Sequence, residues 1–486
     1  MDGMPDAVSP VLLPPATEEI PDIPTRERYR GLIWLVSAAF FMQALDSTIV
    51  NTAVPAMADA LDVTPLGMRS ALTSYVLTLA ILIPASPWLC DRFGTRRVFG
   101  AAIAVFGLGS LFCGIAQTLP ELVAARVMQG VGGAALMPVG RYVLVRSIAK
   151  HEFVRVMSTV ATFGLLGSVL GPLLGGALVE FTSWRLIFLI NVPVGIAGLW
   201  MNKQDMPEYR LRHANRFDLL GFLLFGAASA LLLAASELLG AEHVRWGPIG
   251  EYTALALLIG VIYVWHSQRT AFPVADLSLL KVRSVWVALA GNLFTRLGIS
   301  GMFLLLVLFL QVGCGWSPLL AGLMMVPQAL GSISAKWLVN RALARLGYRR
   351  LLLGNTLLVA LLLASFALFG RTTPMWLIAA MVFLYGSFAG MQYTAMNTLI
   401  YHDLDIRHAS MASSMASTAQ YLSMSFGIAL ATLLMESLLQ GHAHSDYVAA
   451  FRWTVLILAA VTASASRVFA RLGADRPARQ PAAAEA

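Results

Sequence analysis

Charged residues are scarce in this sequence. Asp, Glu, Lys and Arg make up only 12% of its 486 residues, whereas soluble globular domains contain about 25%. Hydrophobic residues make up 58%, and the mean hydropathy is +0.73. A soluble fold of this length could not bury so much apolar surface, and apolar stretches of about 20 residues recur, as in polytopic helical membrane proteins. The net charge of +8 therefore predicts basic residues sorted between loops, and not nucleic-acid binding.

Several catalytic features are also missing. The three cysteines, Cys90, Cys113 and Cys314, lie in or beside apolar segments without disulfide or metal-ligand spacing, so we interpret them as small hydrophobic side chains. We find no nucleotide-binding loop, no metal-ligand cluster and no buried Ser/His/Asp set. These absences predict no enzymatic activity, no catalytic residues, no bound metal and no cofactor.

The two ends of the chain lack apolar character. The first 25 or so residues are rich in Pro, Glu and Asp, and they have neither the basic start nor the short apolar core of a signal peptide. We expect a disordered cytoplasmic tail there. We expect another in the Ala-, Pro- and Arg-rich segment from Arg471 onward.

Fourteen apolar segments are long enough to cross a membrane. Helices are favoured, because the strands of an outer-membrane barrel would appear as alternating segments of about ten residues. The predicted spans are 32–57, 67–90, 98–117, 122–146, 154–180, 185–201, 218–239, 251–268, 285–314, 319–339, 351–370, 375–400, 410–436 and 449–470.

The distribution of lysine and arginine tests this topology. With the amino terminus in the cytoplasm, most basic residues fall on the cytoplasmic side, as the positive-inside rule requires. Arg126 and Arg296 fall inside spans. The basic residues left on the opposite side are Arg69, Arg185, Arg245, Arg371 and Arg452. A missed or false span would remove the bias, so both termini are predicted to be cytoplasmic.

A short repeat supports the same map. "RFGTRR" (Arg92–Arg97) reappears as "RLGYRR" (Arg345–Arg350), each between a second and a third span if counting restarts at the ninth. Duplicated halves around a central site are typical of transporters, although two coincidental basic loops remain an alternative. The predicted units are a tail (1–30), a six-helix bundle (31–201), a linker with two inserted spans (202–284), a second six-helix bundle (285–470) and a cytoplasmic tail (471–486).

A single acidic residue interrupts the first span. In "FMQALDSTIVNTAVP" (Phe41–Pro55), Asp46 is the only charged residue between Gly31 and Ala58. A charge at a helix centre costs about 2.5–3.5 kcal/mol on insertion scales, so its presence indicates a function. Burial favours the protonated carboxyl and a nearby arginine favours the carboxylate, so a group exposed to alternate sides could bind and release a proton. A permanent clamp with Arg126 is the alternative.

The loop after the second span combines an acid, a glycine and basic residues. In "DRFGTRR", Asp91 lies at a helix end and Gly94 permits a tight turn. The basic residues of this loop are Arg92, Arg96 and Arg97. Charge-assisted contacts in such a loop could latch two helices, and a topology signal alone is the alternative.

Glycine stripes mark the fourth and fifth spans. In "RVMQGVGGAALMPVGR", Arg126 shares one helix face with two glycines, and we expect it to face a cavity. In "GLLGSVLGPLLGGALVE", four glycines form one face, and Pro172 predicts a kink. The four are Gly164, Gly167, Gly171 and Gly175. A helix of this kind could slide or bend against a partner, and tight packing is the alternative.

A polar stripe marks the ninth span. In "GNLFTRLGIS", Asn292, Arg296 and Ser300 are four residues apart and share a face, which predicts a cavity or another helix beside it rather than lipid. A fixed cation there would attract carboxylates and disfavour cationic drugs. Bonding of Arg296 within the bundle is the alternative. Further polar candidates to line the cavity are Gln311, Gln328, Gln392, Asn397 and Gln420.

Three glutamates lie near the outer ends of predicted helices. Glu237 and Glu436 are expected to be solvated, and Glu180 is a candidate for an outer gate. The two inserted spans are expected to pack at the periphery, because they are so apolar.

Five motifs together resemble one family. "LDSTIVNTAVP", "DRFGTRR", "RVMQGVGGAALMPVGR", "GPLLGG" and "WRLIFLINVPVG" resemble signatures of the major facilitator superfamily, in its fourteen-helix drug:proton antiporter branch of the EmrB/QacA type. Among these the chain is most similar to the MdtD-like exporters, over roughly residues 30 to 470. One departure is Pro87, where the loop motif usually has a glycine.

The resemblance implies a fold and an activity. The fold is an all-α polytopic membrane protein of the bacterial inner membrane, with the major facilitator arrangement of six, two and six transmembrane helices and both termini cytoplasmic. The activity is export of small molecules, chiefly drugs and xenobiotics, by alternating access in exchange for protons. Asp46 is the implied proton site, and Arg126 assists it. The implied antiporter motif of the fifth helix comprises Gly167, Gly171, Pro172, Gly175 and Gly176.

Other functions stay open at this point. Arg296 makes an exporter of organic anions, such as carboxylates or metal–carboxylate complexes, a rival to a drug exporter. A channel or a membrane sensor fits less well, because duplicated halves suit alternating access and no soluble output domain is present. The expected partners are protons, membrane lipids and the substrate, with no nucleic acid. We expect a monomer, with periplasmic or outer-membrane proteins as candidate partners.

Overall fold

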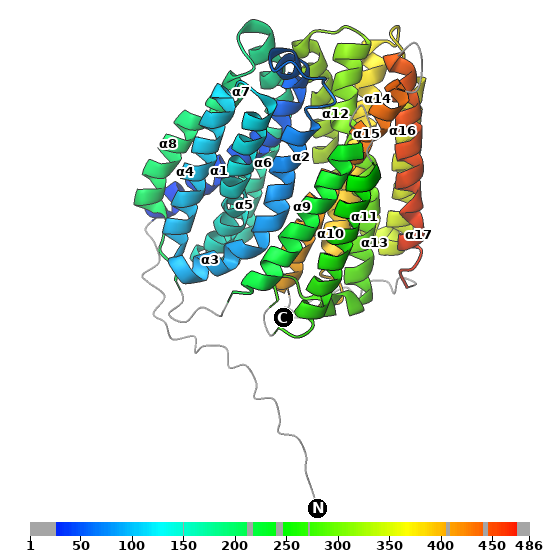
Figure 1. Cartoon of the computed structure of the whole chain (residues 1–486). Coiled ribbons are helices and arrows are strands. Elements are labelled where there is room, and N and C mark those ends of the chain that lie inside the picture. The colour runs from blue at the N-terminus through cyan, green and yellow to red at the C-terminus, as the bar shows by residue number, and fades with distance from the viewer. Residues whose placement is uncertain are drawn as a thin grey trace, which may run out of the picture.

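The computed structural model describes residues 26–148, 150–210, 217–239, 246–270, 273–404, 409–440 and 446–473, and helices joined by short connections account for these residues without any strand. Within these ranges, thirteen helical stretches are long and apolar enough to cross a membrane. Figure 1 shows them side by side in one bundle. The all-helical polytopic fold expected from the composition is confirmed.

The first half of the bundle precedes the two inserted spans. It consists of α1 (Arg26–Ala60), α2 (Arg69–Leu82), η1 (Ile83–Ala85), α3 (Ser86–Phe93), α4 (Thr95–Ile115), α5 (Leu119–Ser147), α6 (Lys150–Phe181), α7 (Leu186–Leu189) and α8 (Asn191–Asp205). The span predicted at 67–90 is divided into α2, η1 and α3. Pro84 and Pro87 lie at the two divisions, and neither can donate a backbone hydrogen bond to the preceding turn.

The inserted spans and the second half follow. The inserted pair is α9 (Leu219–Leu239) and α10 (Trp246–Ser267). The second half consists of η2 (Leu277–Lys281), α11 (Arg283–Ile299), α12 (Met302–Leu308), η3 (Phe309–Gly313), α13 (Pro318–Ser365), η4 (Phe366–Leu368), α14 (Met375–Leu399), α15 (Ala409–Gln440), α16 (Tyr447–Ser464) and α17 (Ser466–Phe469).

Helix α13 contains two of the predicted spans. Its 48 residues would measure about 72 Å at 1.5 Å per residue, more than twice the thickness of the hydrocarbon core. Gly347 has φ 72° and ψ 172°, and the helix is kinked there. Gly94, between α3 and α4, has a similar backbone conformation, with φ 92° and ψ 148°. The matched glycines of "RFGTRR" and "RLGYRR" therefore redirect the chain alike, and thirteen stretches are consistent with fourteen spans.

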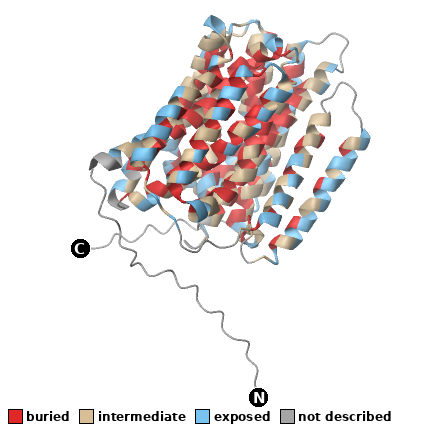
Figure 2. Cartoon of the chain, turned by 60° about the vertical axis from the view of Figure 1, so that its left-hand side comes forward, coloured by how far each residue is buried: buried red, intermediate tan, exposed pale blue. Residues whose placement is uncertain are grey.

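Burial is concentrated in the middle of the bundle, as Figure 2 shows. The apolar core of α1 is 67% buried, whereas those of α9 and α10 are 22% and 17% buried. Large apolar side chains such as Leu257 and Val261 on α10 are exposed, as expected of residues that face lipid. The inserted pair is thus peripheral.

The two halves contact each other at the predicted outer side, which is opposite to the end where α1 begins. The Gln311 amide donates a hydrogen bond to the carbonyl of Thr52 at 3.0 Å. The Ser425 hydroxyl donates to the carbonyl of Thr73 at 3.2 Å, joining α15 to α2. Gly176 of α6 lies so close to Pro318 of α13 that an added Cβ would collide with it. These contacts close the outer side in this structure.

Candidate functional site: a buried carboxylate–arginine network

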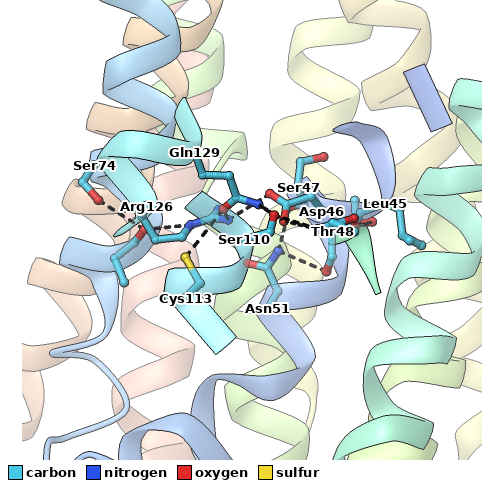
Figure 3. Close-up of polar contacts among 12 residues, drawn as sticks. Leu45, Asp46, Ser47, Thr48, Asn51, Ser74, Ser110, Cys113, Arg126 and Gln129 are labelled. Carbon is cyan, nitrogen blue, oxygen red and sulfur yellow. Dashed lines mark hydrogen bonds and ion pairs between the residues drawn. The ribbon is translucent and has the colours of Figure 1, made fainter. Parts of the chain in front are cut away.

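Asp46 lies in the middle of α1 and is fully buried. Its Oδ2 accepts a hydrogen bond from Arg126 Nη1 at 2.8 Å. Its Oδ1 accepts from Gln129 Nε2 at 2.7 Å and from Asn191 Nδ2 at 3.2 Å. Figure 3 shows the Arg126 and Gln129 side chains reaching Asp46 from α5. The carboxylate is therefore satisfied by three donors without water, and Arg126 is not directed toward the membrane surface.

Ser110 of α4 supports this arrangement. Its hydroxyl oxygen accepts from Gln129 Nε2 at 2.7 Å and from Asn191 Nδ2 at 3.3 Å. Gln129 also accepts from Arg126 Nη1 at 2.6 Å through its own carbonyl oxygen. Four helices, α1, α4, α5 and α8, thus meet at one polar network inside the first half. In a low-dielectric interior such a network is stable only when its members are satisfied together.

Aromatic rings cover the guanidinium of Arg126. Its Cζ lies 4.1 Å from the centroid of the Tyr75 ring and 5.7 Å from that of Phe188. Arg126 is only 2% exposed, so the rings shield a cation that pairs with Asp46. The Tyr75 hydroxyl is itself buried, so this ring and its polar end are enclosed within the first half.

The glycines of α6 hold α1 on both sides of Asp46. A Cβ on Gly167 would lie 2.5 Å from the Phe41 carbonyl oxygen, and one on Gly175 would lie 2.6 Å from that of Ile49. A Cβ on Gly171, between them, would collide with the Thr48 side chain and lie 3.1 Å from the backbone nitrogen of Ile49. Only glycine permits this approach of the two backbones.

The other residues of the fifth-span motifs have different neighbours. Gly176 and Pro172 face α13, where Gly322 lies against the Pro172 carbonyl. Gly164 has open space where its Cβ would be, so it does not join the packed face that the spacing predicted. The motif therefore contacts both α1 and the second half.

The loop after α3 contacts its own half of the bundle. Arg96 Nε donates to the carbonyl of Met206 at 2.6 Å, beyond the end of α8. Asp91 accepts from the Tyr142 hydroxyl of α5 at 3.2 Å. Arg92 and Arg97 are exposed. Gly94 has a positive φ, which favours glycine. These contacts tie the loop to α5 and to the chain after α8.

Arg296 is a second buried cation, in the second half. It is 6% exposed, and its Nε donates to Asn292 Oδ1 at 2.6 Å. Its Cζ lies 3.9 Å from the centroid of the Tyr393 ring. Among the described residues, it forms no ion pair with an acidic side chain. The Ser300 hydroxyl on the same stripe is also buried. The predicted stripe therefore contains a cation that has no acidic counter-ion in the part of the chain that the structure describes.

The other polar candidates lie in different places. Gln311 belongs to the outer contact with Thr52, apart from the Arg296 stripe. Gln392 is fully buried and donates to Thr356 within the second half at 2.8 Å. Gln328 and Gln420 are partly buried, and Asn397 is exposed. Their lining of a substrate cavity stays a prediction.

Several residues of the network were not predicted from the sequence. The sequence did not distinguish Gln129, Ser110 and Asn191 from other polar residues in helices, because all three are neutral. Gln129 could have been found by its position three residues after Arg126, on the same helix face.

The expectation that two outer glutamates are solvated is wrong. Arg69 Nε pairs with Glu237 at 3.0 Å, and Arg69 Nη1 pairs with Glu436. The Glu237 and Glu436 side chains are only 27% and 16% exposed. Glu180, in contrast, accepts a hydrogen bond from the backbone N–H of Leu319 at 3.0 Å, at the outer contact between the halves. Among the described residues, no group of His, Cys, Asp and Glu is arranged to hold a metal ion.

Comparison with known proteins identifies the family of the chain. Residues 36–428 match the model of the Major Facilitator Superfamily. A protein of Serratia proteamaculans named "Putative multidrug resistance protein MdtD" is 40% identical over 450 residues, which are 91% of this chain and 93% of that protein. The proteins of the same name from Cronobacter sakazakii and Escherichia coli O1:K1 are also 40% identical, over 93% of this chain and 96% of each relative.

Solved structures show the same fold at lower identity. A bacterial homologue of the human lysosomal transporter Spinster, inward-facing and occupied, has a TM-score of 0.65 at 12% identity over 92% of this chain and 97% of its own. A D-xylose–proton symporter has a TM-score of 0.62 at 14% identity, over 89% of this chain and 97% of its own. The chain therefore belongs to the major facilitator superfamily, in the group of the MdtD proteins.

Proposed function

We propose that this protein is a proton-coupled exporter of small molecules, an H⁺ antiporter that acts in multidrug efflux by alternating access. The observation that carries the proposal is the buried ion pair of Asp46 and Arg126. This pair lies inside the first half-bundle, which contacts the second half on the outer side. The name of the relatives supports drugs as the substrate class. A member of a transporter superfamily needs no catalytic residues for this activity.

Protonation of Asp46 would change the packing of the first half. A charged Asp46 accepts three hydrogen bonds and balances the charge of Arg126. A proton on Oδ1 or Oδ2 cancels that charge and turns one acceptor into a donor, so at least one of the three contacts must be given up. The donors lie on α5 and α8, so loading and release of one proton can shift these helices against α1.

The proton gradient supplies the energy in this proposal. One proton that crosses the membrane potential releases about 2.3 kcal/mol per 100 mV. The glycine face of α6 gives the shift a route to the second half, because α6 contacts α1 through Gly171 and α13 through Gly176. No cofactor takes part.

Proteoliposomes under an imposed pH gradient test the proposal, with the dye ethidium as the probe for drug transport. Wild type should move ethidium against its gradient, and Asp46→Asn should lose the response to the pH gradient. Asp59→Asn is a matched control, because Asp59 lies on the same helix but is exposed, and it should transport like wild type. Equal pH-driven transport by wild type and Asp46→Asn would show that Asp46 is not the proton site.

Organic anions are a second candidate substrate class, including carboxylates and metal–carboxylate complexes. The specific observation is Arg296, a cation that is only 6% exposed. It contacts the side-chain amide of Asn292 and the ring of Tyr393. A buried charge without a counter-ion is costly, and an anionic substrate would supply that counter-ion. The anionic dye fluorescein tests this reading against ethidium. Arg296→Ala should raise the KM for fluorescein, and unchanged affinity would exclude the anion proposal.

The remaining placement belongs to the same proposal. We place the protein in the bacterial inner membrane as a monomer with both termini in the cytoplasm. The two half-bundles, 31–201 and 285–470, would then rock around a substrate site between them, with 202–284 as the linker. Periplasmic or outer-membrane proteins are candidate partners for moving the cargo beyond the inner membrane.

A further inference from the structure

Arg69 joins three parts of the chain at the outer side. It lies at the start of α2 and is 5% exposed. Its guanidinium pairs with Glu237 of α9, at 3.0 Å, and with Glu436 of α15. Its Nη2 also donates to the backbone carbonyl of Glu237 at 3.0 Å, and the Thr73 hydroxyl donates to Glu237 Oε1 at 3.3 Å. One arginine of the first half thus binds the inserted hairpin and the second half together.

An apolar cluster continues this junction into the membrane. Leu77 of α2, Leu233 of α9 and Ala429 of α15 are buried against one another. The same three helices that meet at Arg69 therefore meet again about two turns farther along α2. Helix α9 lies across the line where the halves contact, although most of its surface is not buried. It is placed to respond when α2 and α15 separate.

We propose that Arg69, Glu237 and Glu436 form an outer lock, in which the inserted helix α9 holds the halves together. The inference rests on the alternating-access mechanism proposed above, but it does not depend on the substrate. It makes Glu237 a positioning residue for the transport cycle. It also gives the inserted pair a role besides contact with lipid.

The lock contains two acidic side chains and one basic side chain. Because two carboxylates share one guanidinium, neutralising either glutamate by substitution leaves a single ion pair, and neutralising both leaves none. The glutamates are 27% and 16% exposed, so outer water can reach them and replace the lost contacts when α2 and α15 separate.

Other titratable residues near the lock are few among the described residues. On α2, α9 and α15, the charged side chains at the outer ends are those of the lock itself. The connections after α9 and α15 lie outside the described residues and contain titratable or charged groups of their own: Glu242, His243, Arg245, His442 and His444. The experiment therefore has to separate the glutamates of the lock from these neighbours.

Cysteine accessibility from the outer side measures the lock. Ser425 is fully buried beside Thr73, so Ser425→Cys in a background without the native cysteines reports whether α15 has left α2. The probe is a membrane-impermeant methanethiosulfonate applied to intact cells. Thr372→Cys, in an exposed outer connection, gives the reference rate. Glu237→Gln and Glu436→Gln should each raise the normalised rate about three- to tenfold, the range expected for partly buried ion pairs.

The matched control is Glu251→Gln. Glu251 lies on α10, in the same inserted pair, but it is exposed, and its replacement should leave the rate unchanged. The Glu237→Gln/Glu436→Gln double variant should be at least as fast as either single variant. If this variant fails to reach the membrane, Glu237→Asp, with a shorter charged side chain, should also raise the rate.

Two results would overturn the inference. The first is an unchanged rate in both single glutamine variants. The second is an equal rise of the rate in Glu251→Gln, because the effect would then not be specific to the lock. Neither of these results involves transport of a substrate, so the lock can fail while the proposed export function stands.

Discussion

The Asp46–Arg126 pair should behave as one energetic unit, which a double-mutant cycle can measure. The perturbations are Asp46→Asn, Arg126→Met and the two combined. Both side chains are at most 2% exposed, so each single substitution leaves its partner charged, or forced to become neutral, inside the bundle. Removing one member of a buried ion pair costs about 3–5 kcal/mol, whereas replacing both members is often neutral.

The structure refines these magnitudes for each variant. Asn in place of Asp46 keeps the shape of the side chain, but one of the two oxygens becomes an N–H donor. Either Arg126 or the amides of Gln129 and Asn191 then lose their acceptor. We therefore expect Asp46→Asn to cost about 3 kcal/mol. Arg126→Met leaves the Asp46 carboxylate buried without its counter-ion, so it should cost a similar amount.

The assay is equilibrium unfolding in mixed micelles of detergent and SDS, followed through the 11 tryptophans. The combined variant should be no less stable than either single variant. The coupling free energy should then be about 3 kcal/mol. Additive losses, with the combined variant weaker by the sum of the two, would show that the contact at 2.8 Å carries no coupling and would refute the reasoning.

Three further substitutions test other parts of the fold. Gly171→Val would place a branched side chain where α6 touches α1, at a cost of about 1–3 kcal/mol of unfolding free energy, whereas Gly164→Ala, in open space, should be neutral in the same assay. Gly94→Ala places a Cβ on a residue with φ 92°, a backbone conformation that is strained for alanine. The free energy of unfolding should therefore fall by about 1–3 kcal/mol. Arg296→Met removes a buried cation that has no acidic partner among the described residues, so its stability should stay equal or rise; a clear loss would show that Arg296 is satisfied without an anion.

Much of the fold was predictable because lipid imposes simple rules. A span must be about 20 apolar residues long, so the positions of the apolar runs indicated where the membrane-spanning helices lie. The cost of a charge in the membrane singled out Asp46, Arg126 and Arg296, and all three are buried. The repeated basic loops predicted a matched turn, and Gly94 and Gly347 have matching backbone conformations.

The parts that the sequence could not predict depend on contacts between distant segments. Glu237 and Glu436 sit near helix ends, where solvation is the ordinary outcome, and only the folded arrangement brings Arg69 to them across 168 and 367 positions of the chain. Gln129 is one amide among several in helices, and its role appears only when Asp46 and Ser110 lie beside it. Neutral partners of a buried charge carry no insertion cost large enough to stand out.

Helix α6 links the surroundings of Asp46 to the junction of the halves, and this follows from the different faces of its glycines. Gly171 is in contact with α1 one turn beyond Asp46, and Gly176 is in contact with Pro318 of α13. Close-packed backbones transmit a displacement because there is no free space between them to absorb it. A shift of α1 on proton binding would therefore press on α6, and α6 would press on α13. The lock at Arg69 lies on the other seam, between α2 and α15, so opening outward requires both seams to part together.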